Sequence, residues 1–118
     1  MISVQYLAHL FVENDGPEIE QTLLQHNIST AEIAESVLLP AGMSAAAYLA
    51  GFLHDIGKYT AAYQEYLVKS ARGDPDAPPK GSVCHTFATV RYILQRWHSP
   101  PQDMYHRLTA ELLAYAAG

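Results

Sequence analysis

A histidine and an aspartate, His54 and Asp55, stand side by side in the otherwise apolar stretch AAAYLAGFLHDIGKY. Burying two such polar groups in a helix is costly unless they pair with each other or bind something that needs both. Imidazole nitrogens and carboxylate oxygens are ligands for divalent ions such as Mn, Fe, Ni, Zn and Mg. We therefore interpret this pair as the centre of a metal site, with mutual capping inside a core as the alternative.

Other histidines along the chain could extend the ligand set. His26 interrupts an apolar stripe, and His85 follows a Pro- and Gly-rich loop at the start of a later helix. Ligands on separate helices can converge in the core of a small bundle. The single cysteine, Cys84, argues against a thiolate zinc site, and we expect it to be a buried small residue. We expect His98 and His106, on either side of a proline turn, to be solvated.

The carboxylate and a nearby lysine indicate the type of chemistry. Asp55 has two oxygens and could bridge two ions, whereas each histidine can serve only one. A bridged pair of ions stabilises both the attacking and the leaving oxygen of a phosphoryl displacement. Lys58, one turn beyond His54, would place a cation near that phosphate. The pattern thus indicates divalent ions as cofactors, with His26, His54, Asp55 and His85 as the candidate ligands. Taken alone, His26 and His85 are also consistent with ordinary polar residues of a helix.

Apolar residues recur mostly at spacings of three and four, which predicts an all-α domain of about five helices. We expect helices over residues 18–39, 44–56, 60–72 and 84–98, and a fifth from Gln102. Pro17 suits the first helical position and Gly57 a C-terminal cap, while residues 72–82, RGDPDAPPKGS, can only be a loop. The predicted apolar stripes are Leu23, Leu24, Ala31, Ala34 and Leu38; Leu49, Phe52, Leu53 and Ile56; Tyr63, Tyr66 and Leu67; Phe87, Val90, Leu94 and Trp97; and Leu108, Leu112, Leu113 and Ala116.

Length and composition bound the function. A chain of 118 residues, 49% hydrophobic and 16% charged, is one ordered domain. Its formal charge of -5 argues against a large basic surface for nucleic acid. One cysteine cannot form an internal disulfide. The sequence has no signal peptide pattern and no apolar run of the ~20 residues that a membrane span needs. We expect a cytoplasmic protein with no membrane partner.

The segment YLAGFLHDIGKYTAAYQEYL, residues 48–67, resembles the signature of HD-domain metal-dependent phosphohydrolases. More narrowly, it resembles the HD nuclease domain of the CRISPR-associated helicase-nuclease of type I systems, with Tyr63 in place of the usual Phe. YLAH (residues 6–9) and TLLQHNISTAEIA (22–34) resemble the opening of that family. VCHTFATVRYIL (83–94) resembles a later segment, where Thr86 replaces the usual Ser and Ala88-Thr89 stand where Gly-Ala is common. The resemblance covers nearly the whole chain.

The resemblance implies a helical fold around a di-metal centre that cleaves single-stranded DNA, with water as the nucleophile. It implies that His26, His54, Asp55 and His85 are the metal ligands. It also implies that Asp55, as the bridge, and Lys58, at the phosphate, are the catalytic residues. The implied partners are single-stranded DNA, a helicase domain or subunit that feeds the strand, and the CRISPR effector complex. His9 matches a family position to which we assign no role.

The family supplies further ligands from a His-His pair after a helix that resembles LLAYAAG, and from a later aspartate. Since the chain ends at Gly118, we expect residues 1–118 to be the N-terminal part of a single HD nuclease domain, incomplete at its C-terminus. Its four ligands would hold one ion weakly, so activity of this fragment stays in doubt. The truncated face would be apolar and favour self-association. Two alternatives are an HD phosphohydrolase acting on nucleotides and a non-catalytic helical module that binds a partner.

Overall fold

The computed structural model describes residues 5–14, 16–98 and 103–118. The described chain is predominantly helical, as expected, but it also contains a small antiparallel sheet, so the prediction of a purely all-α domain is wrong. None of the described helices is long and apolar enough to cross a bilayer. The elements are β1 (Leu7–Val12), β2 (Glu18–Thr22), α1 (Leu23–Leu38), the 3-10 helix η1 (Leu39–Ala41), α2 (Ser44–Leu53), the 3-10 helix η2 (Ile56–Tyr59), α3 (Ala61–Ala71), α4 (Thr86–Trp97) and α5 (Met104–Ala117).

The first predicted helix begins five residues too early, because residues 18–22 form the second strand of a hairpin. β1 and β2 are antiparallel, with Phe11 opposite Ile19. The helix begins after Thr22, whose hydroxyl accepts a hydrogen bond from the Gln25 backbone at 3.1 Å while the Gln25 side chain accepts one from the Thr22 backbone at 3.4 Å. This reciprocal capping box satisfies two backbone donors at the start of α1. It places His26 in the first turn of α1.

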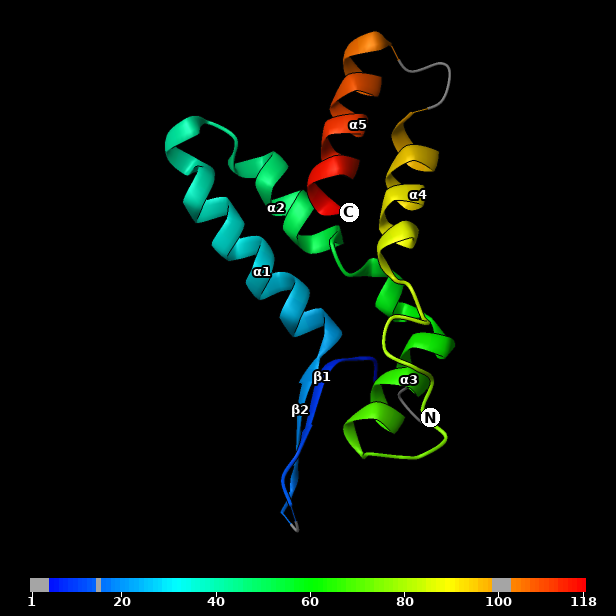
Figure 1. Ribbon diagram of the computed structural model, residues 1–118. Coiled ribbons are helices and arrows are strands. Elements are labelled where there is room, and N and C mark those ends of the chain that lie inside the picture. The colour runs from blue at the N-terminus through cyan, green and yellow to red at the C-terminus, as the bar shows by residue number, and fades with distance from the viewer. Residues whose placement is uncertain (1–4, 15, 99–102) are drawn as a thin grey trace.

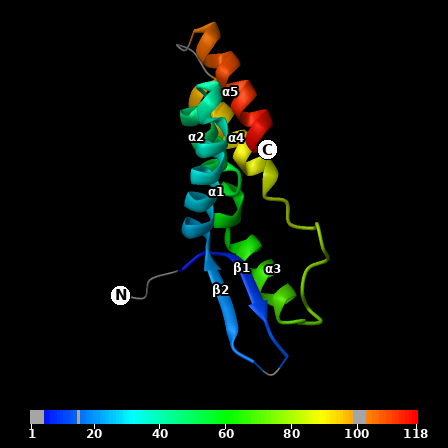
Figure 2. The ribbon, with the colours of Figure 1, turned by 90° about the vertical axis from the view of Figure 1, so that its left-hand side faces the viewer.

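The helices lie in two antiparallel pairs, α1 with α2 and α4 with α5, and the C-terminal end of α5 lies beside α2 (Figure 1). The hairpin and α3 lie at the opposite end of the molecule from the N-terminal end of α5, and β1 and β2 extend away from α1 (Figure 2). α1 and α2 approach closely at Gly51, where a Cβ would lie 2.9 Å from the Cα of Ala31. The main apolar cluster joins α2, α4 and α5 through Leu53, Ile93, Ala110, Ala114 and Ala117.

Several predicted apolar stripes are offset from the buried faces of their helices. The stripe prediction is wrong for five large side chains, which are exposed: Leu24, Leu38, Phe87, Leu108 and Leu112. In α1 the predicted Leu23 and Ala31 are fully buried, whereas the fully buried positions of α4 are Thr89 and Ile93, which the predicted stripe did not contain. Cys84 is exposed, which corrects the prediction of a buried thiol.

The boundaries of the other elements follow the prediction closely, with one exception. α3, α4 and the loop between them are confirmed. α2 ends at Leu53 instead of Ile56, so His54 and Asp55 lie in the turn that leads into η2. Gly57 is therefore part of η2 and not a helix cap. The predicted proline turn at 99–101 and the helix start at Gln102 lie outside the described residues, as does Asp15.

Candidate metal centre

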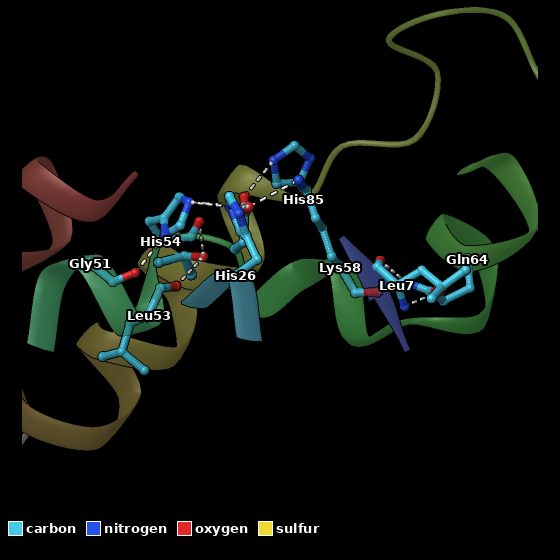
Figure 3. A network of polar contacts seen from close by, with 10 residues as sticks. Leu7, His26, Gly51, Leu53, His54, Lys58, Gln64 and His85 are labelled. Atoms are coloured by element: carbon cyan, nitrogen blue, oxygen red, sulfur yellow. Dashed lines mark hydrogen bonds and ion pairs between the residues drawn. The ribbon is translucent and has the colours of Figure 1, made fainter. Parts of the chain in front are cut away.

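The side chain of Asp55 lies at the centre of a cluster of nitrogen groups. Its Oδ2 lies 2.9 Å from Nζ of Lys58 and 3.1 Å from Nε2 of both His26 and His54. Its Oδ1 lies 3.2 Å from Nε2 of His85. Figure 3 shows His26, His54 and His85 converging from separate parts of the chain. The structure thus brings together all five residues that the sequence singled out.

These five residues come from four separate segments of the chain. His26 comes from the first turn of α1, His54 and Asp55 from the turn after α2, Lys58 from η2, and His85 from the N-terminal end of α4. Two glycines permit the approach of these elements. Gly51 allows α2 to lie against α1, and Gly57 lies against the backbone of His85. In both places a larger residue would push candidate ligands apart.

Three of the donor atoms have the spacing of ligands around one ion. Nε2 of His26 and Nε2 of His54 lie 3.3 Å apart, and each lies 3.1 Å from Oδ2 of Asp55. Ligand atoms with metal bonds of about 2.0–2.2 Å lie about 3.0–3.4 Å from one another at ordinary coordination angles. His26, His54 and Asp55 could therefore hold a metal ion. His85 faces the other carboxylate oxygen and lies outside this group.

The protonation of His54 gives a second argument for a cation at this point. Its Nδ1 lies 2.5 Å from the carbonyl oxygen of Gly51 (Figure 3), and because a carbonyl can only accept, Nδ1 carries the proton. In a neutral imidazole Nε2 then holds a lone pair, and this lone pair faces the Asp55 carboxylate. Such an arrangement is favourable only if Nε2 is protonated or shares a metal ion with Asp55. A backbone carbonyl on the other ring nitrogen is also the usual way in which a ligating histidine is oriented.

The charge states of Asp55, His26 and His85 suit cation binding. Burial of the Asp55 carboxyl opposes its ionisation, but hydrogen bonds from His54 and Lys58 outweigh burial and hold its pKa well below the usual range. The hydrogen bond with Asp55 raises the pKa of His54, against the opposing effect of burial. Burial lowers the pKa of His26 and of His85. Both rings are therefore neutral at pH 7, and neutral imidazole is the form that binds metal.

Two further residues, Gln64 and Tyr63, support the centre, although the sequence predicted no role for them there. Gln64 accepts a hydrogen bond from the backbone nitrogen of Leu7 at 2.8 Å and donates at 2.9 Å to the backbone oxygens of both Leu7 and Lys58 (Figure 3). It thereby ties β1 to the segment that carries Lys58. Tyr63 packs edge to face against His85, with ring centroids 5.0 Å apart. Both lie in the first turn of α3, and the available signal was the segment of residues 48–67 that resembles the family signature.

His9 lies at the edge of the centre. Its ring packs edge to face against the ring of His26, with centroids 5.0 Å apart. The remaining histidines form separate pairs: His98 lies 2.6 Å from Glu111 and His106 lies 2.8 Å from Asp103. Within residues 5–14, 16–98 and 103–118, His26, His54 and Asp55 form the one group of three with metal-ligand spacing.

No family model, curated protein or solved structure matches this chain. The function is therefore inferred from the residue pattern and from the geometry around Asp55.

Proposed function

We propose that this chain is a divalent-metal-dependent phosphohydrolase of the HD type, and that it serves as a nuclease domain for single-stranded DNA. The observation that carries the proposal is the buried Asp55 carboxylate with imidazole nitrogens at both oxygens. A carboxylate placed in this way presents ligands on two sides. Mn, Mg, Ni, Fe and Zn are all compatible with such a donor set.

The roles of the residues follow from their positions. His26, His54 and Asp55 would hold one ion, and Asp55 with His85 would contribute to a second. When bound, divalent ions polarise a phosphoryl oxygen and make water a better nucleophile at neutral pH. Lys58 has its ammonium group 2.9 Å from Oδ2 of Asp55. It would offset the carboxylate charge and attract a phosphate to the same place.

The resemblance of residues 48–67 to HD nuclease domains supports DNA over mononucleotides as the substrate. The net charge of -5, with only 7 lysines and arginines, indicates that the chain does not attract long nucleic acids by itself. We therefore propose that a helicase domain or subunit of a type I CRISPR system delivers the strand, together with the effector complex, in the cytoplasm. The ligands expected from the family after a helix resembling LLAYAAG would complete the second ion site.

The decisive experiment measures cleavage of a labelled single-stranded oligonucleotide by metal-stripped protein after addition of Mn²⁺ or Ni²⁺. We expect cleavage by the wild type and none by Asp55→Ala. Asp76→Ala, in the exposed loop before α4, is the matched control and should cleave like the wild type. Cleavage by Asp55→Ala equal to that of the wild type would refute the proposal. Release of phosphate or base from mononucleotides, with DNA intact, would instead support the nucleotide hydrolase.

A specific observation favours a second candidate, a non-catalytic helical module that binds a partner. An apolar groove of about 380 Å³ runs between α2 and α5 and is lined by Met43, Leu49, Leu112 and Leu113, among others. A module of this kind would need no metal, so chelation would leave its melting temperature unchanged. Melting curves with and without a chelator therefore separate the two candidates.

A further inference from the structure

The buried threonine of α4 is hydrogen-bonded to the turn that carries the candidate ligands. Thr89 is 0% exposed, and its hydroxyl oxygen lies 3.0 Å from the backbone oxygen of Leu53 and 3.1 Å from that of His54. The hydroxyl donates to these two carbonyls, since neither has a proton to give. The periodicity of apolar residues in the sequence predicted no role for Thr89.

These carbonyls lie where α2 ends. The last carbonyls of a helix have no partner within the helix and must find one elsewhere. The carbonyl of His54 belongs to the peptide bond that joins His54 to Asp55. The orientation of this peptide plane determines where both side chains point. The Thr89 hydroxyl therefore acts on the geometry of two neighbouring candidate ligands at once.

Thr89 also connects two separate parts of the centre. It lies four residues after His85, the N-cap residue of α4, so the same end of this helix carries both residues. The Gly57 contact with the backbone of His85 is a second point at which this end of α4 meets the LHDIGK segment. The hydroxyl contact involves residues just before Asp55 in the chain, and the glycine contact involves a residue just after it. Together these two contacts determine the distance between His85 and the Asp55 carboxylate.

We propose that Thr89 is a positioning residue, whose hydroxyl holds the His54–Asp55 peptide so that both side chains meet His26 and His85 in metal-binding geometry. This inference rests on the metal centre proposed above. Thr89 touches neither the metal position nor a substrate, so it acts only through the peptide that it binds. It is nevertheless as deeply buried as the apolar core around it.

The first test compares Thr89→Val, which keeps the shape and removes the hydroxyl, with Thr89→Ser, which keeps the hydroxyl. Co²⁺ is the probe, because its visible spectrum reports coordination geometry as well as affinity. Loss of groups that orient ligands commonly weakens metal binding by about 10–100-fold. We expect a loss of that size and an altered spectrum for Thr89→Val, and wild-type behaviour for Thr89→Ser. Equal affinity and spectrum in the valine variant, or an equal loss in the serine variant, would overturn the inference.

The second test needs no metal. Carbonyl carbon chemical shifts of Leu53 and His54 report whether each oxygen accepts a hydrogen bond, and the ring nitrogen shifts of His54 report its placement. Both sets should move in metal-free Thr89→Val and be restored in Thr89→Ser. Unchanged His54 ring shifts in the valine variant would overturn the inference. A wild type that binds no Co²⁺ would refute the proposed function, while this metal-free comparison would still decide the role of Thr89.

Circular dichroism checks that each variant is folded before it is used. If Thr89→Val does not fold, Thr89→Ala replaces it, since alanine also lacks the hydroxyl and introduces no new bulk. The same comparison with Thr89→Ser then applies. The same outcomes count for and against the inference.

Discussion

Gly57 and the backbone of His85 are in direct contact. A Cβ on Gly57 would collide with the carbonyl oxygen of His85 and would lie 2.8 Å from its Cα. Both atoms belong to the backbone, so a side-chain rotation cannot relieve the clash. The glycine of the HDIGK sequence is thus required by the approach of α4 to η2, and this approach brings His85 to Asp55.

Replacing Gly57 with alanine should therefore separate η2 from α4. We expect Gly57→Ala to lower the free energy of unfolding by about 1–3 kcal/mol, the usual range for overpacking. Gly73→Ala is the control: its Cβ would meet nothing within 4 Å, and only its φ of +65° is unfavourable. That conformation costs about 1–2 kcal/mol. Urea unfolding measures both free energies. If only Gly57→Ala also binds metal more weakly, the cause is displacement of His85 and not a general loss of stability.

The side chain of Gln64 should stabilise the fold through the three backbone groups that it pairs. Gln64→Leu keeps most of the volume but leaves the nitrogen and oxygen of Leu7 and the oxygen of Lys58 without this partner. An unsatisfied buried polar group costs about 1–3 kcal/mol, so we expect a loss of at least about 2 kcal/mol in urea unfolding. Gln95→Leu, at an exposed position of α4, should change stability by less than about 0.5 kcal/mol. Equal effects of the two substitutions would contradict this role.

The stability of the metal-free protein should depend on Asp55 at acid pH. The pKa of Asp55 is lowered in the folded state by His54 and Lys58, in spite of burial. Its contribution to stability is therefore fully present above the unfolded-state pKa of about 3.9 and is lost as the pH falls toward the folded-state value. Urea unfolding between about pH 5 and pH 2.5 should show a steeper decline for the wild type than for Asp55→Asn. Parallel curves would show that the carboxylate is not stabilised by its neighbours.

The exposed apolar side chains of α5 should cause self-association. Leu112 is 71% exposed and lines the groove between α2 and α5. Exposed apolar surface of this kind commonly marks a contact surface. Light scattering coupled to size-exclusion chromatography should show a mass that rises with protein concentration. Leu112→Glu should reduce that rise, whereas Phe11→Glu, on the hairpin, should not. A monomer at all concentrations would contradict the prediction.

The components of the site could be read from the sequence to a large extent. His54 and Asp55 are conspicuous because they are polar neighbours in an apolar stretch, and Lys58 follows one turn later. Nothing local in the sequence shows that His26 and His85 meet the same carboxylate, because that depends on how the helices pack. Thr89 could not be identified, since a threonine on a helix reads as an ordinary polar or core residue until its hydrogen-bond partners are known.

The hairpin shows why part of the fold could not be predicted. Pro17 suits the first turn of a helix, and the residues after it tolerate either state, so pairing with β1 decides the conformation. The true helix start did have a local signal, the capping box formed by Thr22 and Gln25. The offset apolar stripes have a different cause. Ala110 and Ala114 of α5 are buried although they were not in the predicted stripe, because small residues let helices approach closely and a ranking by hydrophobicity does not favour them.

His26 and His54 are 28 residues apart in the chain, yet their Nε2 atoms are neighbours. An ion held between them would be a reversible cross-link that closes this loop, and closing such a loop in an unfolded chain is entropically unfavourable. Since the site exists only in the folded state, a free ion concentration of 100 times the Kd would stabilise the protein by about 2.7 kcal/mol. The resistance of the protein to proteolysis would then increase with the concentration of free metal ion in its surroundings. A chelator would lower that resistance by destabilising the folded state.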